Sequence, residues 1–293
     1  MIDFTTLQGL TIPEGVVTQI TDESGRVIWA VQSGEPIVLE VEKITSDTYA
    51  GETTYTGEQF ILLDIYPKTN GTVKVTYGGL TKTITDTSGA ASPNAQQVFF
   101  GTFNGVTDEV ATPASGTLTI EGDYAAFGIT QFQFSSKSLN WEYCSCITAV
   151  TEWGTPEYIP GHAFTNCNKL NISEIPEGVT KIGSYAFQMS AINDKADTAM
   201  SGGILTIPST VQSIGSYAFV YSYTTASGDG ATLTYHKEIR MLSTIPPTIT
   251  TTTFGAAGHS LGNTDWVVPK GYGEIYKSAS VWSDYKLGIT ETS

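Results

Sequence analysis

The stretch that decides the fold is EIPEGVTKIGSYAF, Glu174–Phe187, because it recurs as TIPSTVQSIGSYAF at Thr206–Phe219. The Ile-Pro, Val and Ile-Gly-Ser-Tyr-Ala-Phe positions keep their order and internal spacing, so that Ile175 corresponds to Ile207 and Phe187 to Phe219. Recurrence of a motif at a fixed period of about 20–50 residues is typical of a solenoid. The second half of the chain is therefore predicted to be a stack of repeated coils.

Weaker copies flank this pair. In the segment 147–170, Ala163-Phe164 precedes Ala186-Phe187. The spacing from Phe164 to Phe187 is shorter than the spacing from Phe187 to Phe219. The shorter interval is taken as the basic unit, and the longer unit then carries a nine-residue insertion. The segment 242–261 forms a degenerate fourth copy with Phe254 at the phenylalanine position. The two insertions, residues 188–203 and 220–231, interrupt an otherwise regular pattern.

The regular positions of the repeat are predicted to be scaffold. A solenoid unit is stable only when its apolar side chains are buried against neighbouring units. One buried layer is expected from Ile175, Val179, Ile182, Ala186 and Phe187, and the next layer from the equivalent residues of the following copy. Ser184 and Ser216 are expected to cap short helical turns that begin at Tyr185 and Tyr217.

The first copy of the IPEGV phrase, Ile12–Val16, does not extend into a repeat. The chain after it alternates through Thr21, turns at DESG and continues as Arg26–Trp29, which predicts two short strands around a turn. These first residues have few apolar groups for a core of their own. Residues 1–35 are therefore predicted to be a strand-rich attachment leader that is stable only when docked.

The segment 36–138 reads as a β-sandwich. Seven short runs alternate in character and are separated by turn residues such as Asn70-Gly71 and Gly78-Gly79. About seven strands in 100 residues are typical of an immunoglobulin-like sandwich. The predicted runs are IVLEVEK, QFILLDIY, GTVKVTYG, LTKTITD, QQVFFGTF, GTLTIEG and FGITQFQF.

The last segment, 139–293, is predicted to hold the repeats and a C-terminal cap. A strand over Trp266–Val268 is stopped by Pro269, and Tyr272, Ile275, Tyr276 and Ala279 then recur at helical spacing, with Trp282 packed below. The whole chain is therefore predicted to be mainly β: a leader, an immunoglobulin-like sandwich and a short repeat solenoid.

Charge and hydropathy exclude several classes of function. The net charge is −15, with 14 basic residues among 293, so binding to a nucleic-acid backbone is not expected. No apolar run is long enough to insert into a membrane, and the N-terminus lacks the basic and apolar regions of a secretory signal. We expect neither membrane insertion nor a signal peptide.

Residues that carry chemistry do not form a site in the sequence. Cys144, Cys146 and Cys167 with a histidine are one candidate metal set, but a buried structural role is favoured for Cys167. His162 occupies the place of Tyr185 and Tyr217 in the repeat and is read as a surface residue. GDG at 228–230 is a candidate for weak calcium binding, although a turn is favoured. No nucleophile or phosphate-loop motif occurs, so the sequence predicts no catalytic residue, no cofactor, no metal and no enzyme activity.

The repeats carry a family resemblance. LTIPSTVQSIGSYAF, EIPEGVTKIGSYAF and the ending WVVPKGYGEIYKSASVWSDY resemble BspA-like leucine-rich repeats over about residues 147–289. The resemblance implies a curved solenoid used for surface attachment or recognition, without a cofactor. Members of this family are often secreted surface proteins of gut and oral bacteria.

The leader carries a second resemblance. DFTTLQGLTIPEGVVTQITDESGRVIWA is similar to the opening of tail-associated proteins in phages and prophages of gut bacteria. Such proteins are assembled in the cytoplasm without a secretion signal. The resemblance implies that the leader attaches to other virion or tail proteins.

Three functions compete at this stage. The first is a non-enzymatic tail-tip or fibre structural protein, located in the virion tail, that binds a host surface glycan or protein. The alternative is a bacterial cell-surface adhesin, and the third is an enzyme that degrades glycans. A second copy of the chain is a further candidate partner. Loop insertions of solenoids often form the binding face, so the candidate receptor-binding residues are Asn193, Asp194, Tyr221, Tyr223 and Asp229.

Overall fold

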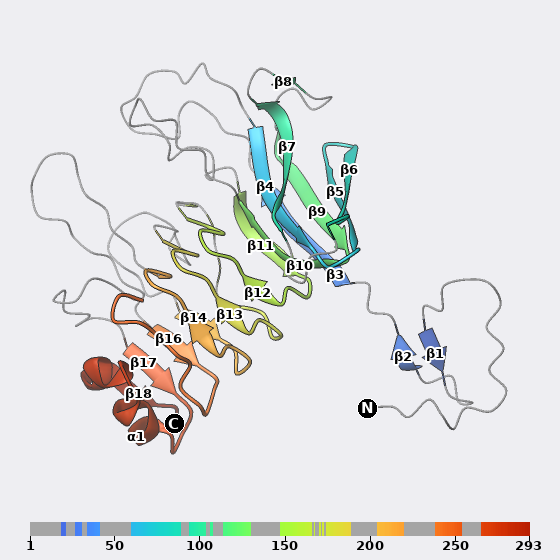
Figure 1. Ribbon diagram of the computed structural model, residues 1–293. Helices are drawn as coiled ribbons and strands as arrows, with labels where there is room; N and C mark the ends of the chain where they lie inside the picture. Colours follow the sequence, from blue (N-terminus) through green and yellow to red (C-terminus); the bar gives the residue numbers. More distant parts are fainter. Residues whose placement is uncertain are drawn as a thin grey trace, which may run out of the picture. The chain divides into compact units, whose positions relative to one another are not determined.

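The computed structural model shows a mainly β chain that divides into two compact units, residues 1–33 and residues 34–293. Figure 1 shows the elements and their labels. The residues that the structure describes are 19–21, 27–30, 34–41, 60–88, 94–103, 106–107, 114–129, 147–165, 167, 170, 172, 174–188, 204–219, 238–253 and 265–293.

The first unit contains one antiparallel strand pair. Strand β1 (Gln19–Thr21) pairs with β2 (Val27–Ala30), with Ile20 opposite Trp29. The two strands expected in the leader are thereby confirmed, while the predicted DESG turn lies outside the described residues. A two-stranded sheet of this length is marginal in water by itself, and the docking of the leader stays a prediction.

The second unit begins with two antiparallel sheets. One has five strands in the order β11-β3-β9-β5-β6, and the other has four in the order β10-β4-β7-β8. The five-stranded sheet consists of β3 (Gly34–Val41), β5 (Thr72–Tyr77), β6 (Leu80–Thr85), β9 (Gly116–Gly122) and β11 (Ile147–Trp153). The four-stranded sheet consists of β4 (Phe60–Pro67), β7 (Gln96–Phe103), β8 (Val106–Thr107) and β10 (Tyr124–Ile129).

Side chains from both sheets meet in one core. Along β5 the buried side chains alternate with exposed or half-buried ones, so Val73, Val75 and Tyr77 point inward. The ring of Tyr77 meets Phe100 of the other sheet edge-on, with ring centroids 5.6 Å apart. Such alternation is the pattern expected of a sheet with one buried and one solvated face.

Strands β3, β4, β5, β6, β7 and β9 confirm six of the seven predicted runs. The seventh run is confirmed only over 127–129, because its remaining residues lie outside the described ranges, and the two-residue strand β8 was not expected. The last strand, β10, begins at Tyr124, ahead of the predicted start at Phe127, and it is buried along its whole length. A further strand, β11, comes from residues assigned to the first repeat and pairs antiparallel with β3. Strand β11 thus places residues that read as a repeat within the five-stranded sheet.

The repeat region stacks short parallel strands on two sides. On one side β12 (Tyr158–Ile159), β13 (Lys181–Ile182) and β15 (Ser213–Ile214) pair in parallel register. On the other side lies a four-stranded parallel sheet of β14 (Ile204–Ile207), β16 (Glu238–Met241), β17 (Asp265–Val268) and β18 (Ile289–Glu291). This arrangement of repeated coils agrees with the leucine-rich repeat reading.

Backbone hydrogen bonds hold one coil to the next. The N–H of Thr180 donates to Glu157 O at 2.9 Å, that of Gln212 to Thr180 O at 2.8 Å, and that of Thr248 to Gln212 O at 2.9 Å. The length of chain between the two partners grows from the first of these pairs to the last. The coil-to-coil contact is therefore the same whatever length of chain lies between two coils.

Phenylalanine rings from successive coils stack on one another within the repeat core. Phe164 and Phe187 have ring centroids 5.2 Å apart, Phe187 and Phe219 5.4 Å apart, and the ring planes are within 10° of parallel in both pairs. Phe187 and Phe219 are 1% and 4% exposed, which confirms the predicted buried, stacked layers. The other predicted layer residues are buried as well.

The hydrogen-bond pattern of the coils continues into β10. Glu157 N–H donates to Ala125 O at 2.8 Å, and Ile129 N–H donates to Ala163 O at 2.6 Å. Phe127 also meets Phe164 edge-on at 5.4 Å. The two sheets and the repeat region thus share a continuous core, while the boundary predicted at 138/139 falls among residues outside the described ranges.

The chain ends in a short helix α1 (Gly273–Ser278), a 3-10 helix η4 (Trp282–Gly288) and β18. Tyr276 and Trp282 are buried and meet edge-on at 5.1 Å, as the helical spacing predicts. The same spacing places Ile275 on this inner face, but Ile275 is 48% exposed. The short helix buries Gly273 and Tyr276, and leaves the Ile275 side chain toward solvent.

Among the described residues there is no helix long and apolar enough to cross a membrane.

Candidate recognition site on the repeat region

A second row of rings runs beside the buried phenylalanines, at the surface. The residues are His162, Tyr185 and Tyr217, which we call the ring row. The His162 and Tyr185 centroids are 4.8 Å apart with planes 7° from parallel, and the Tyr185 and Tyr217 centroids are 5.1 Å apart with planes 14° from parallel. His162 is exposed and both tyrosines are half-buried. The stack therefore lies at the surface, with one ring from each of three successive coils.

All three ring-row residues adopt a left-handed backbone conformation, with φ of 61° at His162, 61° at Tyr185 and 58° at Tyr217. Side chains other than glycine enter this region at a cost of about 1–2 kcal/mol. Ring stacking contributes about 0.5–1.5 kcal/mol per pair. The cost of the left-handed conformation and the gain from ring stacking are of similar size. Stability alone therefore gives no strong reason for aromatic side chains at these positions.

Hydrogen bonds to the next coil fix this conformation. The N–H of His162 donates to Ser184 O at 3.0 Å, that of Tyr185 to Ser216 O at 2.9 Å, and that of Tyr217 to Thr252 O at 2.9 Å. The expected helical turns that begin at Tyr185 and Tyr217 are wrong, because both tyrosines have a left-handed φ and the chain forms non-helical turns there. The ring positions are consequently set by the coil stack itself.

Two glycines of successive coils, Gly183 and Gly215, precede the ring-row tyrosines by two residues, and we call them the glycine column. A Cβ atom at Gly183 would lie 2.4 Å from Gly161 N and 2.6 Å from Pro160 C. A Cβ atom at Gly215 would lie 2.5 Å from Ser184 N. Only glycine permits this approach of backbone to backbone.

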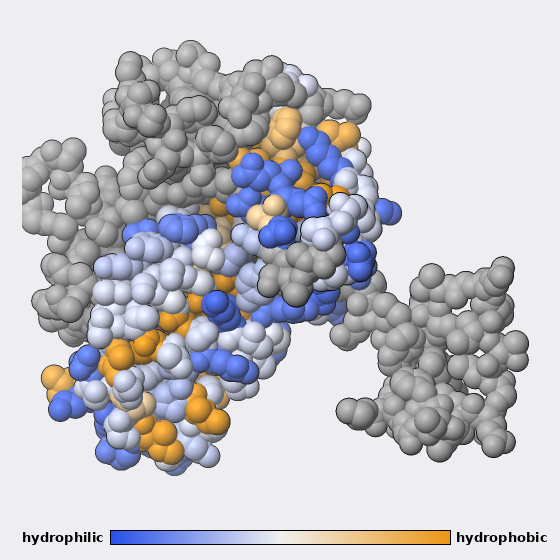
Figure 2. Space-filling view, in the orientation of Figure 1, coloured by the Kyte–Doolittle hydropathy of each residue, from blue (hydrophilic) through white to orange (hydrophobic). Residues whose placement is uncertain are grey.

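Hydroxyl groups surround the ring row. The side chain of Ser216 hydrogen-bonds that of Thr250 in the next coil at 3.1 Å, and Thr165 Oγ1 donates to Tyr185 O at 2.6 Å. The residues that directly precede the rings are Gly161, Ser184 and Ser216, all without charge. Figure 2 shows pale, weakly polar surface over much of the repeat region, with orange apolar areas toward its C-terminal elements.

The predicted receptor-binding residues lie outside the described residues. Both insertions leave the coil just after a phenylalanine of the buried stack, at Phe187 and at Phe219. The chain is described again at β14 and at β16, neighbours in the parallel sheet. The predicted receptor-binding role thus remains a prediction for Asn193, Asp194, Tyr221, Tyr223 and Asp229.

Metal-binding side chains do not gather within the described part of the chain, where no group of three histidine, cysteine or acidic residues is placed to hold an ion. Cys167 is buried and its Sγ donates to Thr165 O at 3.9 Å, which agrees with a packing role. Cys144, Cys146 and the GDG turn at 228–230 fall outside the described ranges.

Tyrosines with raised pKa values mark packing contacts. Burial, with smaller contributions from Tyr66 and Glu157, raises the pKa of Tyr158 to about 12. Tyr158 meets Tyr66 of β4 edge-on at 6.0 Å, and Lys68 forms an exposed ion pair with Glu157 at 2.8 Å. Burial alone raises the pKa of Tyr276, whose hydroxyl donates to Ser243 O at 2.8 Å. These groups fasten neighbouring elements to one another.

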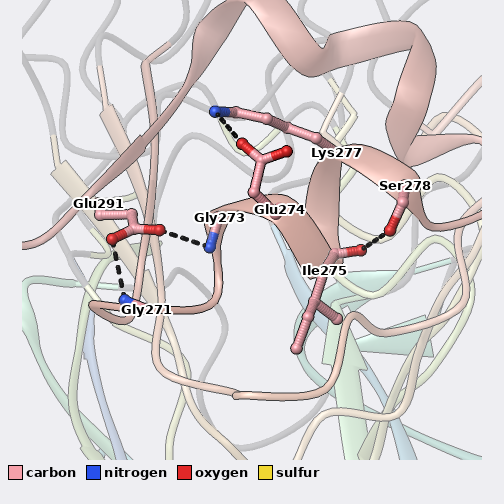
Figure 3. Close-up of polar contacts among 7 residues, drawn as sticks. All are labelled: Gly271, Gly273, Glu274, Ile275, Lys277, Ser278 and Glu291. Carbon is pink, nitrogen blue, oxygen red and sulfur yellow. Dashed lines mark hydrogen bonds and ion pairs between the residues drawn. The ribbon is translucent and has the colours of Figure 1, made fainter.

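The C-terminal elements are fastened by the carboxylate of Glu291 (Figure 3). One oxygen accepts the N–H of Gly271 at 2.9 Å and the other accepts the N–H of Gly273 at 2.8 Å. These two hydrogen bonds are the main cause of a pKa of Glu291 below its usual range. The contact joins β18 to the start of α1, so it stabilises the end of the coil stack.

Reasoning from the sequence does not identify the ring row as a site, although its signal is visible there. His162 aligns with Tyr185 and Tyr217 across the repeats. What the sequence does not show is the left-handed backbone, which turns the same position of each coil outward and brings the rings into one stack.

Comparison with known families agrees with the repeat geometry. No curated protein matches the chain. A family model described as "BspA type Leucine rich repeat region (6 copies)" matches residues 135–222, the part that contains β11 to β15 and the whole ring row. The repeat region of this chain is thus similar to the BspA-type leucine-rich repeats.

Proposed function

We propose that this chain is a non-enzymatic recognition protein whose repeat region binds a receptor on a host cell surface. The observation that supports it is the BspA-type repeat over residues 135–222, a repeat type that fits surface adhesion or receptor binding. Coils of this kind commit their regular positions to the core. Recognition then falls on the surface positions between them, and the two insertions supply the most freely varied surface.

The proposal extends to the setting in which the protein works. The leader resembles the openings of phage and prophage tail proteins, and residues 1–33 form a unit separate from the rest. In this proposal the leader attaches the chain to other tail proteins, the immunoglobulin-like sheets act as a spacer, and the repeat region acts as the receptor-binding head of a tail tip or fibre. Several copies on one virion would make weak single contacts strong in combination.

The second candidate is a bacterial cell-surface adhesin, which the repeat match favours equally. The two candidates differ in where the protein resides. Mass spectrometry of purified virions and of washed cell envelopes from the producing strain separates them. Recovery in the tail fraction supports the tail protein, and recovery in the envelope alone supports the adhesin.

Attachment is tested by removing the predicted binding residues. Deletion of residues 189–197, the extra nine, is expected to leave the melting temperature within a few degrees, because the coil contacts are independent of the intervening length. Binding to host cells is expected to fall. A second variant, Tyr221→Ala with Tyr223→Ala, removes the large contact side chains of the other insertion. Undiminished attachment of both variants to cells contradicts the assignment of these loops as the binding face.

A further inference from the structure

We propose that the ring row binds a linear, neutral polysaccharide, with one sugar unit over each coil. The inference rests on the proposed recognition role, but it assigns a different site and a ligand class. The site consists of His162, Tyr185 and Tyr217 with the hydroxyl groups of Ser184 and Ser216 beside them. No residue of the two insertions takes part in it.

The repeat distance of the row selects the ligand. Successive ring centroids are 4.8 and 5.1 Å apart. An extended peptide advances by about 3.3 Å per residue and by about 6.6 Å between side chains on one face, so it runs out of register with the row. An extended chain of pyranose rings advances by one ring length per unit, which is close to one coil. A polymer of sugars therefore places one unit over each coil.

Charge argues for a neutral polymer. The chain carries a net charge of −15, and the residues that directly precede the rings are glycine and serine. A polyanion such as a nucleic acid or an acidic glycan would be repelled by this field and would find no lysine or arginine within the row. A neutral chain of hydroxyl groups meets no such penalty.

The exposed groups of the row suit hydroxyl-rich ligands. Because the rings stack on one another, the faces between them are occupied, and the polar groups that the row can offer a ligand are two phenolic hydroxyls and one imidazole. A phenolic hydroxyl both donates and accepts a hydrogen bond, and an imidazole nitrogen adds one more such group. Sugar hydroxyls need partners of both kinds, so the row satisfies them without a charged residue.

The row is also held in place before a ligand arrives. The backbone N–H of each ring residue is bonded to the following coil, and each ring is packed against the next. A ligand therefore orders few side chains when it binds, which favours affinity from a small contact area. Flat, ribbon-like chains with β-1,4 linkages keep their sugar units in line, and we expect these to bind best.

The test uses the purified full chain and oligosaccharides of a β-1,4-linked glucan, from disaccharide to hexasaccharide, measured by titration calorimetry. Affinity is expected to rise with length up to about the number of coils in the row and then to level off. Carboxylated glucan of the same length is expected to bind more weakly because of the acidic field. Absence of binding to every length, or equal binding of a proline-free extended peptide, overturns the proposal.

The decisive variant is Tyr185→Asn with Tyr217→Asn. Asparagine tolerates the left-handed conformation better than most residues, so the fold is retained while the rings are removed. Each lost hydrogen bond of ordinary strength weakens binding by about two- to tenfold, so the loss of both is expected to weaken binding by about four- to hundredfold. Tyr272→Asn, the same change outside the row, serves as the matched control and is expected to retain affinity.

Tyr185→Phe with Tyr217→Phe separates the hydroxyls from the ring stack. The phenylalanine pair keeps the rings, so weaker glucan binding with an unchanged melting temperature supports recognition through the hydroxyl groups. Unchanged binding by the asparagine pair contradicts the site even where the glucan itself binds. Host-cell attachment of the loop deletion and of the ring-row variants is measured separately. If the loop deletion loses attachment and the ring-row variants keep it, the proposed function stands and this inference is rejected.

Discussion

The backbone N–H of Ile129 donates to the carbonyl oxygen of Ala163 at 2.6 Å. This bond is equivalent to those from Phe164 to Ala186 and from Phe187 to Ala218, which join one coil to the next. Strand β10 therefore occupies the place of a coil that precedes the first repeat. It belongs to an antiparallel sheet and, with its main chain and Phe127, also covers the first face of the stack.

The first prediction follows from this shared strand. A fragment of residues 34–293 is expected to unfold in one transition, whereas a fragment of 139–293 loses β10 and the strand partner of β11 and exposes Phe164. We expect the shorter fragment to be strongly destabilised and prone to aggregate, because an apolar coil face is left uncovered. Near-UV circular dichroism during a denaturant titration measures the unfolding transition of each fragment. A cooperative, monomeric 139–293 would contradict the capping role of β10.

The second prediction concerns the buried phenylalanine stack. Phe219 is 4% exposed and stacks on Phe187, so Phe219→Ala is expected to lower the free energy of unfolding by about 3–5 kcal/mol. Leu287→Ala is the control, because Leu287 is 97% exposed and such changes stay within about 0.5 kcal/mol. A loss below about 1 kcal/mol for Phe219→Ala in a urea titration would mean that the stack does not stabilise the fold.

The third prediction concerns the glycine column. Gly183→Ala places a Cβ atom 2.4 Å from Gly161 N, against backbone that has no room to move. We expect a loss of about 1–3 kcal/mol, as for other overpacked sites. Gly116→Ala is the matched control, since a Cβ atom there meets nothing within 4 Å. Equal melting temperatures of the two variants would show that the coils are not held this close.

The fourth prediction is a pH dependence at the C-terminal end. Hydrogen bonds from Gly271 and Gly273 hold the pKa of Glu291 below its usual range. The folded state therefore binds this proton less readily than the unfolded state. The resulting stability is present above the unfolded pKa and is lost as the pH falls through the lowered folded value.

Glu291→Gln is expected to lower stability at neutral pH and to flatten its decline on the acid side. The control is Glu274→Gln, which removes an exposed ion pair with Lys277 and is expected to change little. Melting temperatures measured from neutral to acid pH compare the two. An acid decline as steep in Glu291→Gln as in the unmodified chain would assign the effect to other carboxylates.

Internal repetition made the repeat core predictable. The equivalence of Phe187 and Phe219 follows from two nearly identical phrases in successive repeats, and burial of one implies burial and stacking of the other. The strands of the two sheets were also predictable, since alternation and turn residues act within short stretches. Local patterns of this kind contain enough information to place an element, though not its partners.

Long-range pairing was beyond the sequence. The run at β11 reads as a repeat, yet its antiparallel pairing with β3 decides its position. The ring row depends on the sign of φ at Tyr185 and Tyr217, and a tyrosine gives no local hint of a left-handed conformation. Hydrogen bonds to the next coil impose it, so it appears only when the coils are assembled. The predicted receptor-binding residues fall outside the described ranges and remain predictions.

The pairing of β3 with β11 has a consequence for how the protein is made. Thr151 Oγ1 donates to Val38 O across 113 residues of chain. At a synthesis rate of about 5–20 residues per second, β3 leaves the ribosome roughly 6–23 s before β11 exists. Until β9 is made both edges of β3, and after that the edge that β11 will occupy, stand open to pairing with other nascent chains. Slow synthesis or crowded expression is therefore expected to raise misassembly, and co-expressed chaperones that shield strand edges are expected to raise the yield of soluble protein.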